Sequence, residues 1–279
     1  MDARRPGRPD GCPELVSRRQ LLWLAGSAGL AATISACSNP AAAEPPTRPS
    51  PSPTRSPNPA AGPEAGPPAN LSPEPIAPSA SAVASAALLC RDAWGARAAR
   101  AGGRPHTVTR MTIHHTATVL GDNSNITARL RQHQQYHQDQ KGWIDIAYHI
   151  GVDRDGNIFE LRNPDLAGDT ATNYDPAGHF LVVCEGNFDE EVVTDAQLHG
   201  AALAFAWAAQ RFGITTDTLA GHRDVSHDTA CPGANLHAHV ASGNLKRRID
   251  DLLAAGAVDL QPACGPDAAA IVSEIEAGY

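Results

Sequence analysis

A proline-rich stretch divides this chain and limits where it can form a hydrophobic core. Residues 38–88 hold 14 of the 23 prolines, are otherwise rich in Ala and Ser, and contain almost no bulky apolar side chains. A segment of that composition cannot bury enough apolar surface to fold, and it behaves as a semi-extended tether. We therefore expect residues 38–88 to be a disordered linker and residues 89–279 to contain the folded part.

The segment before the linker has the pattern of an export signal. Residues 17–22, Ser-Arg-Arg-Gln-Leu-Leu, form a twin-arginine pattern, and the apolar stretch that follows ends in Ser-Ala-Cys37. Small residues before a cysteine resemble the bacterial lipoprotein signal, in which the cysteine is lipidated. We predict that residues 1–37 direct export and that Cys37 anchors the chain to the outer face of the cell membrane. Cleavage near Ala36 and an uncleaved anchor are the alternatives.

Net charge excludes one class of partner. Residues 89–279 carry 15 Lys+Arg and 24 Asp+Glu, a net charge of −9. Such a domain lacks the positive surface that phosphate backbones require, so we expect no nucleic-acid binding. The same residues contain no apolar run long enough to span a bilayer. We expect membrane contact through the N-terminal lipid only, and a monomer.

Hydrophobic periodicity predicts a mixed α/β fold. Phe180 to Cys184 is a continuous apolar run, typical of a central strand covered on both faces. Thr194 and Gln197 form a capping-box pattern before a long apolar helix that stops at Gly213. The architecture we expect is a central mixed β-sheet flanked by α-helices. The expected strands are 111–114, 147–152, 157–161 and 180–184, the second and third joined by a turn at 153–156, and the expected helices are 124–141, 195–212 and 236–255.

Four cysteines lie in the folded part. Cys184 is expected to be buried and inert, because it ends an apolar run. Cys90 and Cys264 flank the domain at its two ends, and we predict that they form a disulfide, although the spacing leaves the connectivity open. Cys231 lies in a Pro-Gly turn nine residues after a histidine, which suits a metal ligand.

Three histidine groups are candidates for metal binding. One is His114-His115 at the end of a strand, the second is His133 and His137 on a helix, and the third is His222 with the later cysteine. A zinc ion that catalyses hydrolysis has three protein ligands and one open position. The helical pair lacks the general-base Glu of zincins, because Gln134 occupies that place, so we interpret it as a solvated helix face.

Four ordered stretches together carry a family resemblance. They are residues 112–117 (Thr-Ile-His-His-Thr-Ala), 143–149 (Trp-Ile-Asp-Ile-Ala-Tyr-His), 185–188 (Glu-Gly-Asn-Phe) and 221–233 (Gly-His-Arg-Asp to Cys-Pro-Gly). This order resembles the zinc N-acetylmuramoyl-L-alanine amidases, which include the peptidoglycan recognition proteins and phage amidases. Residues 91–97 resemble the start of that domain. The resemblance implies a zinc amidase domain over residues 89–257 and leaves 258–279 as a C-terminal extension, which packs on the domain through Cys264 or serves a partner.

The resemblance also implies roles for particular residues. His114, His222 and Cys231 match the zinc ligands, and Tyr148 matches the catalytic tyrosine. Thr229 matches a catalytic-site residue near the metal-bound water or the substrate oxyanion. The implied reaction is hydrolysis of the amide between N-acetylmuramic acid and L-alanine of peptidoglycan in the cell envelope, with Zn²⁺ as a Lewis acid. On a strand, neighbouring side chains face opposite ways, so the histidine that follows the tyrosine is expected to be packed rather than catalytic.

Other positions depart from the family pattern or leave alternatives open. The interval from the second histidine ligand to the cysteine is nine positions rather than the more common eight, an insertion that a loop can absorb. The alternative function is a non-catalytic peptidoglycan-binding module with a structural zinc, closed by a fourth ligand such as His115 or His227. The residues expected to contact substrate are His115, Thr170, Asn173 and Asn187.

Overall fold

The computed structural model describes residues 84–278. The predicted export signal, including Cys37, and residues 38–83 of the predicted linker lie outside the described residues. Between Ala84 and Gly278, no helix combines the length and the apolar character needed to cross a bilayer.

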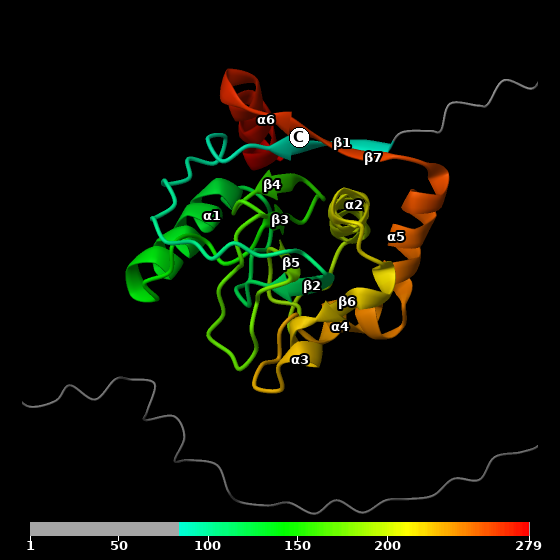
Figure 1. Cartoon of the computed structure of the whole chain (residues 1–279). Helices are drawn as coiled ribbons and strands as arrows, with labels where there is room; N and C mark the ends of the chain where they lie inside the picture. Colours follow the sequence, from blue (N-terminus) through cyan, green and yellow to red (C-terminus); the bar gives the residue numbers. More distant parts are fainter. Residues whose placement is uncertain (1–83, 279) are drawn as a thin grey trace, which may run out of the picture. The chain divides into compact units, whose positions relative to one another are not determined.

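A seven-stranded mixed sheet forms the centre of the fold (Figure 1). Its strand order is β6-β2-β5-β3-β4-β1-β7, and all neighbouring pairs are parallel except the β3–β4 hairpin. The predicted mixed sheet is therefore confirmed. The strands are β1 (Ala84–Leu89), β2 (Arg110–His115), β3 (Ile150–Val152), β4 (Ile158–Glu160), β5 (His179–Cys184), β6 (Leu219–Gly221) and β7 (Val258–Ala263).

Helices cover both faces of the sheet. The helices α2 and α5 pack into one core cluster, and α1 and α6 pack into the other (Figure 1). Strand β5 lies between them and is buried along its whole length, because Val182 contacts the α2 side and Val183 the α1 side. The helices are α1 (Ile126–Gln135), α2 (Asp195–Phe212), α3 (His222–Val225), α4 (Ala234–Ala241), α5 (Asn244–Ala255) and α6 (Gly265–Ala277).

Two helix predictions need correction. Only half of the predicted capping box forms: Thr194 Oγ1 accepts a hydrogen bond from the amide of Gln197 at 3.0 Å, but the Gln197 side chain donates to two core carbonyls instead. The single helix predicted over residues 236–255 is wrong, because the chain forms α4 and α5 with a break between them. Gly243 lies in that break with φ +69°, a left-handed conformation that glycine adopts without strain.

The helix face that carries His133 and His137 is not solvated, contrary to our prediction. Gln134 is fully buried; its side-chain amide donates to Arg97 O and to Asp145 Oδ1, and its carbonyl accepts from the amide of Arg97. A π-helical turn, Tyr136–Gln140, extends the helix, and His137 within it is also buried. Gln134 thus ties the helix to the segment before β2 and to Asp145 before β3. Nδ1 of His137 accepts a hydrogen bond from the amide of Ala147 at 3.2 Å, so burial leaves neither side chain unpaired.

The two ends of the described chain form one edge of the sheet. Strand β1 pairs with β7 along all of its residues, and Cys90 and Cys264, which follow these strands, form the predicted disulfide. The prediction that the linker includes residues 84–88 is therefore wrong. Small side chains there still form a strand, because its backbone is hydrogen-bonded to β4 on one side and β7 on the other. Residues 258–278 pack on the domain, which was one of the two alternatives.

The disulfide is expected to stabilise the fold strongly. Replacing Cys264 with Ser should lower the free energy of unfolding by about 2–5 kcal/mol, because the bond joins residues 174 positions apart and restricts the unfolded chain. Denaturant unfolding followed by tryptophan fluorescence measures this change. Reduced wild-type protein is the matched control and should unfold at the same denaturant concentration as the variant. An unchanged midpoint in both would show that the bond contributes nothing.

Candidate metal centre and groove

The candidate site lies where β2 ends. Side chains alternate along this strand, so Ile113 enters the core on the α2 side. His114 lies in register with Val183 of β5, which faces the α1 side. The sheet geometry that packs the core therefore also fixes the direction of His114.

Two further ligand candidates follow the edge strand β6. His222 is the first residue of α3, and Cys231 lies in the loop between α3 and α4. This loop passes very close to another chain segment: Gly233 has φ +85°, and a Cβ atom there would lie 2.6 Å from the carbonyl carbon of Phe188. Only glycine permits that approach, which explains the Gly of the Cys-Pro-Gly motif.

The three side chains converge on one point. Nδ1 of His114 lies 3.6 Å from Sγ of Cys231, and the ring centroids of His114 and His222 are 4.6 Å apart. The three candidate ligand atoms all lie within 4.8 Å of one another. Tetrahedral ligands with Zn–N of about 2.0 Å and Zn–S of about 2.3 Å lie roughly 3.5 Å apart, so the group is compact enough for one ion.

The chemistry of these donors also fits a cation. Nε2 of His114 is buried and has no hydrogen-bond partner among residues 84–278, a state that buried polar groups rarely keep. Burial lowers the pKa of His114 well below its ordinary value and that of His222 to about 4, so both imidazoles are neutral and offer a lone pair. Burial raises the pKa of the Cys231 thiol to about 12, so its thiolate requires a cation beside it.

A closed structural site needs a fourth ligand. Neither of the predicted candidates, His115 and His227, supplies it. Nδ1 of His115 accepts a hydrogen bond from the amide of Phe188 at 3.3 Å, and His227 is exposed; neither belongs to the ligand group. The other group with metal-ligand spacing in the described chain contains Cys90 and Cys264, whose sulfurs are already bonded to each other. Three protein ligands are the number that a catalytic zinc site uses.

Tyr148 lies beside the ligand candidates. Its ring centroid is 5.1 Å from that of His114, and both residues line one cavity. Burial raises the pKa of Tyr148, so its hydroxyl stays protonated and remains a hydrogen-bond donor. The next residue, His149, is packed as predicted: its Nδ1 accepts from the amide of Leu181 at 2.9 Å, and its Nε2 lies 3.0 Å from Leu166 O.

The cavity next to this group has a volume of 380 Å³. Of the predicted substrate contacts, His115 and Thr170 line it. Asn173 and Asn187 do not; their amides donate to Asp228 at 3.0 Å and Glu190 at 2.7 Å. Thr229 lines the cavity, but its Oγ1 accepts a hydrogen bond from the amide of Cys231 at 3.1 Å, so its role near an oxyanion stays a prediction.

The chain resembles known proteins over the same region. The family model described as N-acetylmuramoyl-L-alanine amidase matches residues 104–234. Peptidoglycan-recognition protein SC2 of Drosophila melanogaster is 31% identical over 160 residues, which cover 56% of this chain and 86% of that protein. The chain belongs to the family of peptidoglycan recognition proteins and N-acetylmuramoyl-L-alanine amidases.

Other members of this amidase family agree in sequence and in fold. The human N-acetylmuramoyl-L-alanine amidase is 33% identical over 156 residues, which cover 53% of this chain but only 26% of that longer protein. The structure of a Drosophila PGRP-LB variant in complex with tracheal cytotoxin matches with a TM-score of 0.50 and 28% identity, covering 56% of this chain and 93% of that chain.

Two residues of this amidase-family site contact the candidate ligand His222, and we did not predict this role from the sequence. Thr172 Oγ1 lies 2.7 Å from Nε2 of His222, and the Tyr174 ring centroid lies 5.0 Å from the same imidazole. Both come from the loop between β4 and β5, which has no periodic pattern. The only signal was the prediction that Thr170 and Asn173 contact substrate, which marked this loop as part of the groove.

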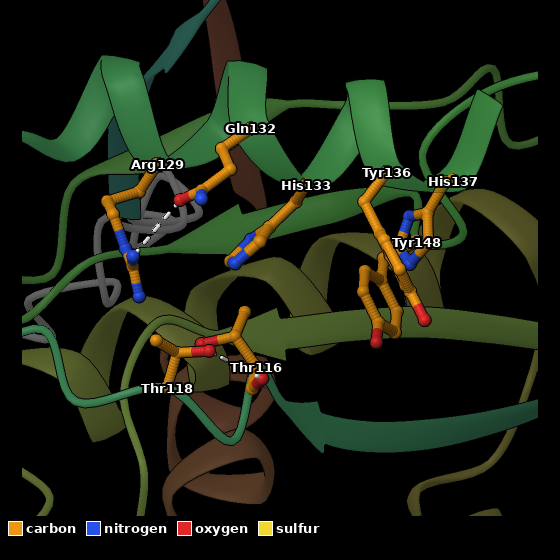
Figure 2. Close-up of a pocket in the computed structure, with 8 residues that line it drawn as sticks. All are labelled: Thr116, Thr118, Arg129, Gln132, His133, Tyr136, His137 and Tyr148. Atoms are coloured by element: carbon orange, nitrogen blue, oxygen red, sulfur yellow. Dashed lines mark hydrogen bonds between the residues drawn. The ribbon is translucent and has the colours of Figure 1, made fainter. Parts of the chain in front are cut away.

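A second cavity of 280 Å³ continues the groove of this family member beneath α1 (Figure 2). It shares Thr116, Tyr136, His137 and Tyr148 with the larger cavity. In Figure 2 the side chains of α1 point down towards Thr116 and the neighbouring Thr118, which come from the loop after β2. The two cavities therefore form one continuous groove past Tyr148.

Proposed function

We propose that this chain is a zinc-dependent amidase that hydrolyses the bond between N-acetylmuramic acid and L-alanine of peptidoglycan. The observation that carries the proposal is the convergence of His114, His222 and Cys231, with Tyr148 beside them in one cavity. A zinc ion held by these residues would act as a Lewis acid on the amide carbonyl and activate water for attack. The names of the family model and of the human relative support this substrate.

The chain's own residues have separate tasks in this reaction. His114 and His222 hold the ion as neutral ligands, while the amide of His115 donates a hydrogen bond at 3.4 Å to the sulfur of Cys231 and so stabilises its charge. The hydroxyl of Tyr148 donates to the carbonyl oxygen, where negative charge develops as the amide is attacked. Because Tyr148 already lies at the cavity, this donor needs no rearrangement.

We propose further that the protein works outside the cytoplasm, anchored by a lipid on Cys37. The twin-arginine pattern and the small residues before that cysteine support export. The disulfide between Cys90 and Cys264 is typical of proteins in an oxidising compartment. Metabolic labelling with a fatty acid tests the anchor, and label that persists in Cys37→Ala would contradict it.

Peptide release from purified peptidoglycan, read by mass spectrometry, tests the activity. We expect free stem peptides that begin with L-alanine, lost when a chelator removes the metal and restored by added zinc. The protein used must begin before Ala84, because a chain that begins at residue 89 loses all but the last residue of β1. Bound zinc without peptide release would instead indicate a non-catalytic binding module.

A further inference from the structure

The first turn of α1 takes its capping acceptor from the far end of the chain. Asn125, the residue before the helix, makes no side-chain capping hydrogen bond, and the first turn contains no acidic residue. Instead the carboxylate of Glu276, on α6, accepts hydrogen bonds from the amide of Thr127 at 3.1 Å and from its hydroxyl at 2.6 Å. A helix that lines the groove is therefore capped by a residue 149 positions away.

Glu276 is placed unfavourably for its own helix. It lies in the last turn of α6, where the helix dipole is negative and a carboxylate costs free energy. That turn contains no basic residue to offset the charge. Thr127, by contrast, is buried, and its hydroxyl and amide would be costly without an acceptor. The position of this carboxylate is thus explained by what it does for α1 rather than for α6.

The start of α6 is anchored independently of α1. The disulfide between Cys90 and Cys264 holds the residue before this helix, and the amide of Gly265 donates to Oδ2 of Asp92 at 2.9 Å. Both partners of these contacts lie in the segment that follows β1. Along its length, α6 contributes apolar side chains to the same core cluster as α1. A helix fixed in this way can hold the first turn of α1 in place.

The capped turn lies beside the second cavity. Arg129, two residues after Thr127, lines that cavity, and Gln132 and His133 line it from the next turn (Figure 2). Because side chains of one helix move together, a shift of the first turn changes this wall of the groove. The three candidate metal ligands come from β2, α3 and the loop after α3. Loss of the cap is therefore expected to affect ligand binding and to leave the metal in place.

We propose that Glu276 is a positioning residue for the groove: by capping α1 from the C-terminal helix, it keeps this wall in the form that binds a muramyl peptide. The inference rests on the proposed function and deepens it, because it makes substrate binding depend on α6. The family model matches residues 104–234, so the helix that supplies the carboxylate lies outside the matched region. Residues 258–278 are accordingly part of the binding machinery.

Substitutions at the end of α6, made in the full chain, test this role. Glu276→Ala removes both hydrogen bonds and should raise KM for a muramyl tetrapeptide about 3- to 10-fold, while kcat and zinc content are kept. Glu276→Gln keeps an acceptor oxygen but loses the charge, so its KM should lie between those of the wild type and Glu276→Ala. Glu274→Ala, which removes an exposed carboxylate from the same turn, is the matched control and should keep the wild-type KM.

Hydrogen exchange and binding separate this inference from the proposed function. Measured by mass spectrometry, the amides of α1 should exchange about 5- to 30-fold faster in Glu276→Ala than in the wild type or Glu274→Ala. The stem tetrapeptide without muramic acid cannot be hydrolysed, and calorimetry with zinc-loaded protein should show it binding about 3- to 10-fold more weakly to Glu276→Ala. Unchanged exchange of α1, or equal affinities of Glu276→Ala and the wild type, would overturn the positioning role. The expected losses without hydrolysis of any muramyl peptide would leave that role standing and refute the amidase.

Discussion

Replacing Cys231 with Ala is expected to remove both bound zinc and the hydrolysis of muramyl peptides. Its sulfur is one of three ligand atoms that converge within 4.8 Å, and it is the only one that brings negative charge. Loss of the metal removes several kcal/mol of transition-state stabilisation. At about 1.4 kcal/mol per factor of ten, kcat/KM should fall roughly 10³-fold or more. Metal content and kcat/KM measured on the same samples test both effects.

Cys184 offers a matched control for this substitution. It is the other cysteine of the described chain outside the disulfide, and it is buried in β5 on the α2 side of the sheet. Cys184→Ala should lower the stability of the core while zinc content and turnover are kept. Turnover retained in Cys231→Ala, or zinc lost equally from both variants, would show that Cys231 is not a ligand.

Replacing Tyr148 with Phe is expected to lower kcat by about 10²- to 10³-fold, or roughly 2.7–4 kcal/mol, as for the loss of one oxyanion donor. The phenol is protonated, and its ring centroid lies 5.1 Å from that of His114. Zinc content and KM should stay close to those of the wild type, because the hydroxyl acts when charge develops and does not hold the metal. Steady-state kinetics and metal analysis of the variant test this.

Tyr174→Phe is the control for Tyr148→Phe. It removes a hydroxyl from a tyrosine that contacts His222 but does not line the cavity. Its hydroxyl is buried and has no partner in the described chain, so we expect a much smaller change in kcat than for Tyr148→Phe. Equal losses in the two variants, or a loss of zinc from Tyr148→Phe, would assign Tyr148 a structural role.

Patterns along short stretches of sequence predicted most of the fold. The apolar run that became β5 is distinctive because a strand covered on both faces needs no polar positions. The start of β1 could not be predicted, because its side chains form no distinctive pattern. Its stability resides in backbone pairing with β4 and β7, strands that lie far away in the sequence, and its own side chains are mostly small. The break at Gly243 was missed because periodicity continues across a single glycine.

The three candidate ligands could be identified from their motifs, but the residues that contact them could not. Thr172 and Tyr174 contact His222 from about 50 positions away in the chain, and no local pattern marks them. The face of α1 around Gln134 was misread for a related reason. A run of polar residues normally faces water, and only the folded chain shows that Asp145 pairs with this one.

The far end of the chain supports one wall of the groove. The carboxylate of Glu276, on α6, accepts hydrogen bonds from both the amide and the hydroxyl of Thr127, in the first turn of α1. A negative charge there also complements the positive end of the helix dipole. The terminus chosen for a purification tag or fluorophore can therefore affect the groove. A label fused after the last helix lies next to the support of α1, so a label placed in the predicted linker before Ala84 is the safer design for ligand-binding measurements.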